Sequence, residues 1–241
     1  MQSPYGLEIV ENCQSCKLLT GRVFCDLLRP NLNALQSLGF TIVCPKGTVI
    51  IAEGQPAEEI AVLCMGHVKV SMASETGKRV CVGIESPGTV LGMSAAIAGT
   101  PNQVLIEAFE PCQLRIIKTD RFLAFLRKDS LACLAAVASL SNDVRKLSSW
   151  VRLIGLSHTA TQKLAQVLIR WDMHEDDEPK GKPHLRFPLT HKELAEIVGV
   201  SRETVTRLLS RFEQRDLIQY RGTTLVIEDE RTLRALAART T

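Results

Sequence analysis

The segment LTHKELAEIVGVSRETVTRLLSRFEQR, residues 189–215, constrains the fold of this chain most. Thr190 is placed to cap a first helix, and Glu193, three residues later, completes a capping box. Gly199 can end that helix because glycine adopts the left-handed turn easily, and Ser201 can cap a second helix. Apolar side chains fall at helical spacing in both halves. The pattern predicts a helix-turn-helix rather than an ordinary helical hairpin, which does not require a glycine there.

The second helix of this motif leaves a polar face for an external partner. An arginine can bind guanine through two hydrogen bonds, a glutamate accepts from cytosine, and a threonine methyl contacts the thymine methyl. A solvated, salt-bridged face is the alternative. Arg202 and Glu203, however, stand at the helix start, where a docked helix-turn-helix meets the bases. We therefore predict double-stranded DNA as partner, contacted by Ser201, Arg202, Glu203, Thr206, Arg207 and Ser210.

Composition gives weaker constraints. The 241 residues suggest one to two domains, and the net charge of +3 does not by itself indicate nucleic acid. Residues 202–221 contain five arginines and three acidic residues, which makes a weakly basic patch. The longest apolar run, around residues 131–140, is shorter than the roughly 18 residues of a membrane span. With no signal-peptide pattern, we expect a cytoplasmic protein without membrane association.

The rest of the chain predicts an α+β fold. Residues 40–119 contain short runs of valine, isoleucine and threonine separated by glycine turns, as in a small β-roll of jelly-roll type. Two strands at 217–220 and 223–227, then a helix at 231–238, would make the helix-turn-helix winged. The expected domains are a cysteine-bearing N-terminal arm (1–28), a β-roll sensor domain (29–128), a dimerisation helix (129–154) and a winged helix-turn-helix DNA-binding domain (155–241).

The predicted helix 129–154 carries a heptad pattern of apolar residues typical of a two-stranded coiled coil. A helix that packs on its own domain is the alternative, but the opposite side of this helix is polar. A homodimer would supply the two-fold symmetry that a palindromic DNA site requires. The predicted dimer interface comprises Val137, Leu140, Val144, Leu147, Val151 and Ile154.

Eight cysteines are many for a cytoplasmic chain, in which disulfides are rare. Four of them lie in apolar runs and are expected to behave as small core residues: Cys44, Cys64, Cys81 and Cys133. Three others lie in a short arm that looks polar, with little else to bury: Cys13, Cys16 and Cys25. The eighth, Cys112, follows a proline between two strand-like runs.

The order of roll, long helix and winged helix-turn-helix resembles the CRP/FNR family of bacterial transcription regulators over nearly the whole chain. The motifs that carry the resemblance are PKGTVIIAEGQPAEEIAVLCMGHVKVS and LTHKELAEIVGVSRETVTRLLSRFEQRDLI. The resemblance implies a homodimeric regulator, not an enzyme, in which a signal at the roll orients the two recognition helices. It also implies RNA polymerase as a partner. Arg202, Glu203 and Arg207 are similar to the reader residues of the cyclic-AMP receptor branch, whereas Thr206 takes the position of a serine in the FNR branch.

The resemblance disfavours a cyclic nucleotide as the signal. Family members that bind cyclic AMP carry a Gly-Glu pair for the ribose and an Arg-Ser pair for the phosphate. Here Gly88–Thr89 and Asn102–Gln103 occupy those positions. A buried phosphate without its arginine would be an unpaired charge, which is very costly.

The cysteines make the resemblance closest to the FNR-like iron–sulfur sensors, in which an arm cluster and one distant roll cysteine hold a [4Fe–4S] cluster. The implied ligands are Cys13, Cys16, Cys25 and Cys112, and the implied signal is oxygen, nitric oxide or redox state. Eight residues separate Cys16 from Cys25, more than in the usual FNR arm. A zinc site, a thiol–disulfide switch at Cys13–Cys16, or unliganded cysteines remain open.

Two functions of other classes also remain open. A thiol enzyme could use the CxxC pair, but that motif belongs at a helix start in a βαβ unit, and no catalytic set is evident among the five scattered histidines. A small-ligand-binding module without a DNA role is the second.

Overall fold

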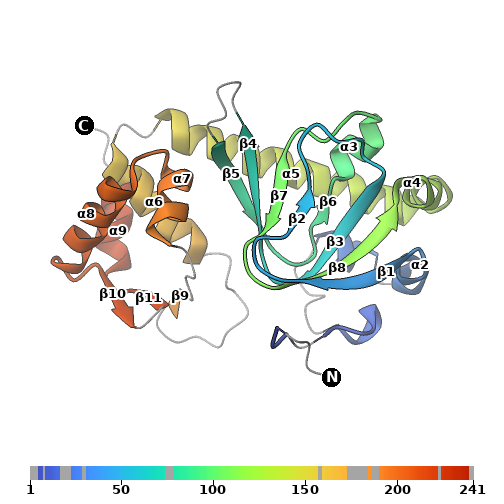
Figure 1. The fold of residues 1–241 in the computed structure, drawn as a ribbon, viewed down its shortest axis with the longest axis horizontal. Coiled ribbons are helices and arrows are strands. Elements are labelled where there is room, and N and C mark those ends of the chain that lie inside the picture. The colour runs from blue at the N-terminus through green and yellow to red at the C-terminus, as the bar shows by residue number, and fades with distance from the viewer. Residues whose placement is uncertain are drawn as a thin grey trace. The chain divides into compact units, whose positions relative to one another are not determined.

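The computed structural model of the chain describes residues 5–7, 9–16, 23–28, 31–73, 79–156, 159–172, 184–185, 190–221 and 224–238. The chain divides into two compact units, Met1–Leu147 and Ser148–Thr241, each described here by itself (Figure 1).

The first unit is a β-roll flanked by helices (Figure 1). Its antiparallel strands form two sheets of order β1-β8-β3-β6 and β2-β7-β4-β5. The strands are β1 Gly39–Cys44, β2 Val49–Ile51, β3 Glu59–Met65, β4 Val68–Ala73, β5 Arg79–Glu85, β6 Val90–Leu91, β7 Leu105–Ala108 and β8 Cys112–Lys118. The helices are η1 Cys13–Ser15, α1 Val23–Leu27, α2 Leu32–Ser37, α3 Met93–Ala98, α4 Thr119–Lys128 and α5 Ser130–Leu156, the last of which continues into the second unit.

In the sheet β1-β8-β3-β6, side chains alternate along each strand, and the central strands β8 and β3 are buried on both faces, whereas β1 is largely exposed. One face packs on helices and forms the helix-side cluster, which includes Phe24, Leu35, Ile60, Val62, Ile117 and Phe122. The other face meets the second sheet and forms the roll-interior cluster, which includes Cys44, Ala61, Leu63, Cys112, Leu114 and Ile116. Strands β3 and β8 therefore place their odd-numbered and even-numbered residues in different environments.

The N-terminal arm is more apolar in structure than its sequence suggested. Phe24 and Leu28, from α1 and the residue that follows it, are almost fully buried in the helix-side cluster. The rings of Phe24 and Phe122 lie with their centroids 6.2 Å apart. The expectation that the arm has little to bury is wrong, because this short helix places apolar side chains on one side.

Helix α5 has a buried and an exposed side. Ala132, Ala135 and Ala136 are buried in the helix-side cluster. On the other side, four residues of the predicted dimer interface are exposed: Val137 (58%), Val144 (64%), Leu147 (51%) and Val151 (63%). Leu140 instead packs against the helix-side cluster, and the side chain of Ile154 lies outside the described residues.

The second unit is a winged helix-turn-helix, as the sequence predicted. Its helices are α6 Ala160–Asp172, α7 His191–Val198, α8 Arg202–Glu213 and α9 Glu230–Ala238. Its antiparallel sheet has the order β10-β11-β9, from β9 His184–Leu185, β10 Ile218–Arg221 and β11 Thr224–Ile227. In the part of the chain that is described, no helix combines the length and the apolar character needed to cross a membrane.

Candidate functional site

The helix-turn-helix is built by the local signals that predicted it. Thr190 and Glu193 form a reciprocal capping box, in which the Thr190 hydroxyl accepts from the Glu193 amide at 3.2 Å and the Thr190 amide donates to Glu193 Oε2 at 2.7 Å. Gly199 adopts a φ of 75°, and its amide donates to the carbonyl of Ala195 at 2.9 Å, closing helix α7.

Helix α8 separates its apolar side from the face predicted to bind DNA. Ser201 caps it by accepting from the Thr204 amide at 3.2 Å. The buried side chains are Val205, Leu208, Leu209 and Phe212. The six residues predicted to contact DNA are all exposed: Ser201, Arg202, Glu203, Thr206, Arg207 and Ser210.

His191 is a neighbour of this face that sequence reasoning missed. Its Nδ1 lies 2.8 Å from the Thr206 hydroxyl, which also donates to the carbonyl of Arg202 at 3.0 Å. The Thr206 hydroxyl is thus occupied within the motif, and its methyl group is the part left for a base. Glu203 sits among the free amides of the helix start, where its own amide and Ser201 lower the pKa of its carboxyl. It is therefore an ionised acceptor.

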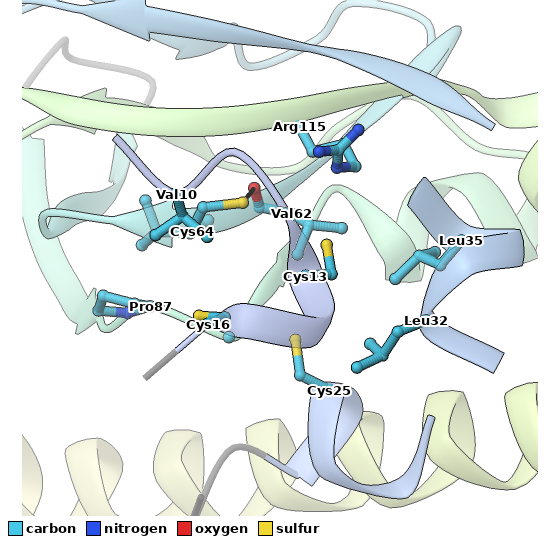
Figure 2. A pocket seen from close by; sticks show the side chains of 12 residues that line it. Val10, Cys13, Cys16, Cys25, Leu32, Leu35, Val62, Cys64, Pro87 and Arg115 are labelled. Atoms are coloured by element: carbon cyan, nitrogen blue, oxygen red, sulfur yellow. Dashed lines mark hydrogen bonds between the residues drawn. The ribbon is translucent and has the colours of Figure 1, made fainter. Parts of the chain in front are cut away.

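The three arm cysteines line one pocket on the helix side of the roll (Figure 2). We call it the cysteine pocket, and its walls are Val10, Cys13, Cys16, Cys25, Leu32, Leu35, Val62, Leu63, Cys64, Pro87, Gly88 and Arg115. Apart from one arginine, its side chains are thiols and hydrocarbon. Cys13 comes from η1, Cys25 from α1 and Cys64 from the end of β3.

Two glutamines, Gln113 and Gln36, tie the arm to this face. The side chain of Gln113 makes two hydrogen bonds with the backbone of Val10, at 2.8 and 2.7 Å, as a neighbouring strand would. Gln36 Oε1 accepts from the Cys13 amide at 3.1 Å. Both contacts hold the arm by its backbone, so the cysteine side chains are left to line the pocket.

Cys112, the expected fourth ligand, is not brought to the arm cysteines. It lies in the roll-interior cluster, opposite Cys44 in the pairing of β1 with β8, and its Sγ is 3.2 Å from the carbonyl oxygens of His67 and Glu110. The alternation of β8 explains this placement: Cys112 points into the roll, whereas Gln113 and Arg115 point to the arm. Cys64, which was expected in the core, lines the cysteine pocket beside the arm instead. The same alternation along β3, read as Ile60, Val62, Cys64, is a sequence signal that could have found it.

Arg115 is the only buried charged side chain in the described residues, with 6% exposure. Its Nη1 donates to the carbonyl of Gln36 at 3.0 Å, and its Nε has no hydrogen-bond partner among those residues. Burial raises the pKa of the Cys13 thiol, and the positive charge of Arg115 opposes that rise. Burial also raises the pKa of Cys64 to about 12. The same cause raises that of Cys112 to about 12.

The spacing of these thiols bears on what they can hold. All eight cysteines are described and none is in a disulfide. No three cysteine, histidine or acidic side chains of the described residues are close enough to hold one metal ion. Four thiolates on one zinc would stand ~3.8 Å apart, given Zn–S bonds of about 2.3 Å. In an iron–sulfur cube each thiolate binds its own iron, so the ligands are spread around a larger group. Thiols gathered at one pocket are the donor type that an iron–sulfur cube uses, and in the described residues they are not placed as ligands of one metal ion.

The positions at which the resemblance would imply cyclic-AMP contacts serve the fold here. Asn102 is buried, its Nδ2 donates to the carbonyl of Gln55 at 3.2 Å, and its carbonyl accepts from Gly54 at 2.7 Å. The hydroxyl of Thr89 donates to Glu85 Oε2 at 3.2 Å. Neither position offers a cation for a phosphate.

Comparisons with known proteins agree with both units. Residues 41–129 match the cyclic nucleotide-binding domain family, and residues 162–236 match the Crp-like helix-turn-helix domain family. The cAMP-activated global transcriptional regulator CRP of Pasteurella multocida is 29% identical over 189 residues, covering 76% of this chain and 87% of that protein.

Two solved structures share the fold. FixK2 from Bradyrhizobium japonicum has a TM-score of 0.73 at 20% identity, covering 84% of this chain and 99% of that one. A CooA mutant from Carboxydothermus hydrogenoformans has a TM-score of 0.72 at 19% identity, covering 91% and 98%. The curated relatives are transcription regulators, not enzymes. The chain therefore belongs to the CRP/FNR family of DNA-binding transcription regulators.

Proposed function

We propose that this regulator responds to oxygen, nitric oxide or redox state through an iron–sulfur cluster held by Cys13, Cys16 and Cys25 together with a fourth thiolate. The observation that carries the proposal is the convergence of these three thiols on one apolar pocket against the roll. A bound iron–sulfur cluster supplies one-electron redox chemistry and reactivity toward oxygen and nitric oxide.

The packing of the arm suggests how such a signal reaches the long helix. Cys25 belongs to the same short helix as Phe24, which packs against Phe122 of α4. The buried alanines of α5 lie in the same helix-side cluster. When the thiolates no longer hold a common group, α1 can leave the helix-side cluster more easily. Helix α5 then loses part of the apolar packing that holds its buried alanines. The arm thus biases the position of the helix that carries the exposed apolar stripe.

We infer that this stripe pairs with a second copy of the chain. Val137, Val144 and Val151 are seven residues apart and more than half exposed, with Leu147 beside them. Such a row in water favours burial against an identical row. The homodimer would present two α8 helices to a palindromic site, and RNA polymerase is the further partner that we infer for the DNA-bound dimer.

Cyclic AMP is the activator named for the CRP relatives, and we propose that it is not the signal here. Asn102 stands where the phosphate-binding arginine would be, and its polar groups are bonded to the loop at Gln55. A thiol–disulfide switch is a second candidate, favoured by the closeness of Cys13 and Cys16. The Cys16 amide donates to the Cys13 carbonyl at 3.4 Å.

Anaerobic purification tests the proposed function. The protein should be coloured, contain iron and acid-labile sulfide, and bind a selected palindromic fragment with an affinity that changes on exposure to air. Cys13→Ser should lose the iron and the response. Cys133→Ser should keep both, because Cys133 is exposed outside the pocket and not, as expected from the sequence, in the core. A colourless, iron-free protein that binds DNA with full affinity would refute the cluster. A response to air that dithiothreitol reverses in that iron-free protein would support the thiol switch.

A further inference from the structure

A buried arginine without a carboxylate partner is the unexplained feature of the cysteine pocket. Arg115 is 6% exposed, forms no ion pair within the described residues and leaves Nε without a hydrogen bond. An uncompensated buried cation is costly, so a pocket that keeps one is suited to an anionic group. The other polar atoms of the pocket are thiol sulfurs, which carry the complementary charge only when they bind a metal or lose their protons.

Strand alternation decides which thiols can share a group with that cation. On β8, Gln113, Arg115 and Ile117 face the arm and helices, and Cys112 lies on the opposite face. On β3, Ile60 and Val62 face the helices, and Cys64 continues the same row. A ligand bound to the arm cysteines can therefore reach Cys64 without crossing the sheet. Reaching Cys112 would require a change in the β8 pairing that buries it.

The close view of the pocket agrees with this arrangement. The sulfurs of Cys13, Cys16, Cys25 and Cys64 surround the pocket, with Arg115 beside Cys13 (Figure 2). The Cys64 thiol makes a long contact with the carbonyl of Val62, at 3.6 Å, and interacts with the backbone of Arg115. Cys112 by contrast has two carbonyl neighbours at 3.2 Å and is completely buried.

We propose that Cys64 is the fourth thiolate of the cluster site and that Arg115 is the buried cation that offsets the negative charge of the bound group. The inference rests on the proposed iron–sulfur function. Four thiolates around an iron–sulfur cube leave a net negative charge, and one guanidinium in a low-dielectric wall stabilises it. Because reduction adds a further negative charge, the same cation also stabilises the reduced form over the oxidised form.

Iron and sulfide content of two serine variants tests the ligand assignment. The full-length protein and its Cys64→Ser and Cys112→Ser variants are purified without oxygen and reconstituted with ferrous iron and sulfide. We expect Cys64→Ser to lose the bound iron and sulfide and Cys112→Ser to retain them. Loss in Cys112→Ser with retention in Cys64→Ser overturns the assignment and leaves the proposed function standing. A wild-type protein that takes up neither iron nor sulfide overturns both.

The midpoint potential of the loaded protein tests the role of Arg115 and does not depend on a cysteine variant. Arg115→Gln should shift the potential to more negative values, and Arg115→Lys should restore most of the shift. Arg127→Gln, at an exposed arginine of α4, should leave the potential unchanged. Circular dichroism of each apoprotein checks that the roll is folded. An unchanged potential in a folded Arg115→Gln protein overturns the counterion role.

Discussion

Asp143 of α5 makes the stability of this protein depend on pH in a direction that can be worked out. Its partly buried carboxyl has a pKa raised to about 6, first by burial and then by the nearby carboxylate of Glu85, with Lys146 opposing the rise. Lys146 itself forms an ion pair with Glu85 of β5. Two carboxylates therefore share one ammonium group.

Between about pH 4 and pH 6, the folded protein holds a proton on Asp143 that the unfolded chain has released. The free energy of unfolding therefore falls as pH rises through that window, and above it the ionised carboxylate costs stability. Two pKa units correspond to roughly 3 kcal/mol. Because the side chain is partly exposed, screening reduces this to about 1 kcal/mol.

We expect Asp143→Asn to raise the free energy of unfolding by about 1 kcal/mol at pH 8 and to have almost no effect near pH 4. Urea unfolding followed by circular dichroism at the two pH values measures this, with separate transitions fitted for the two units. Glu58→Gln, at an exposed glutamate of the roll, is the matched control. A loss of stability at pH 8 would show that Lys146 outweighs burial, and an equal gain at both pH values would show that charge is irrelevant.

Five further substitutions have effects that follow from local features of the structure. Gly66→Ala should lower the free energy of unfolding by more than about 2 kcal/mol, because the backbone is left-handed and the added Cβ would lie 2.4 Å from a backbone oxygen. Gly54→Ala is the control: its backbone is equally left-handed but its Cβ would meet open space, so the loss measured by urea unfolding should be about 1 kcal/mol. Thr190→Ala should cost about 1 kcal/mol in thermal unfolding because it removes a cap. Arg207→Ala should weaken binding to the selected DNA site by about 1–3 kcal/mol and reduce sequence specificity at one base pair, measured by fluorescence anisotropy with base-substituted sites. An equal loss of affinity for all sequences would instead make Arg207 a phosphate contact. Leu147→Asp should give a monomer in sedimentation, whereas an intact dimer would place the interface elsewhere.

The parts of the fold that the sequence predicts best are those fixed by local chemistry. The capping box at Thr190, the left-handed Gly199 and the cap at Ser201 each depend on residues within four positions, and all occur in the structure as predicted. Helix α1 was missed because a five-residue helix in a cysteine-bearing segment is stabilised by tertiary burial of Phe24, not by its own propensity.

The cysteine site could be predicted only in part, because membership of a pocket depends on sheet register. The spacing of Cys13 and Cys16 suggested a site, but nothing local says which face of a strand meets the arm. The resemblance to the FNR-like sensors implied Cys112 as a ligand, yet its side chain points into the roll. If the register of β8 shifted by one residue, Cys112 would face the arm and Gln113 would face the roll interior.

The register of β8 also decides which elements the cysteine pocket contacts. The face of β8 that bears Arg115 is the face on which α1, α2, α4 and α5 pack, so the cysteine pocket shares its support with the helices and not with the roll interior. A change in the arm therefore alters first the packing of Phe24 and of the alanines of α5. Strands β2, β4, β5 and β7 lie on the other side of the sheet. We propose that the outer, helix-covered face of the roll is the route from sensor to reader, because Asn102 holds the position where the family resemblance implies a phosphate-binding arginine. If it is the route used, Phe24→Ala should weaken the coupling between the redox state of the arm and DNA binding while leaving the iron content of the arm unchanged. Full coupling in a folded Phe24→Ala protein would place the route elsewhere.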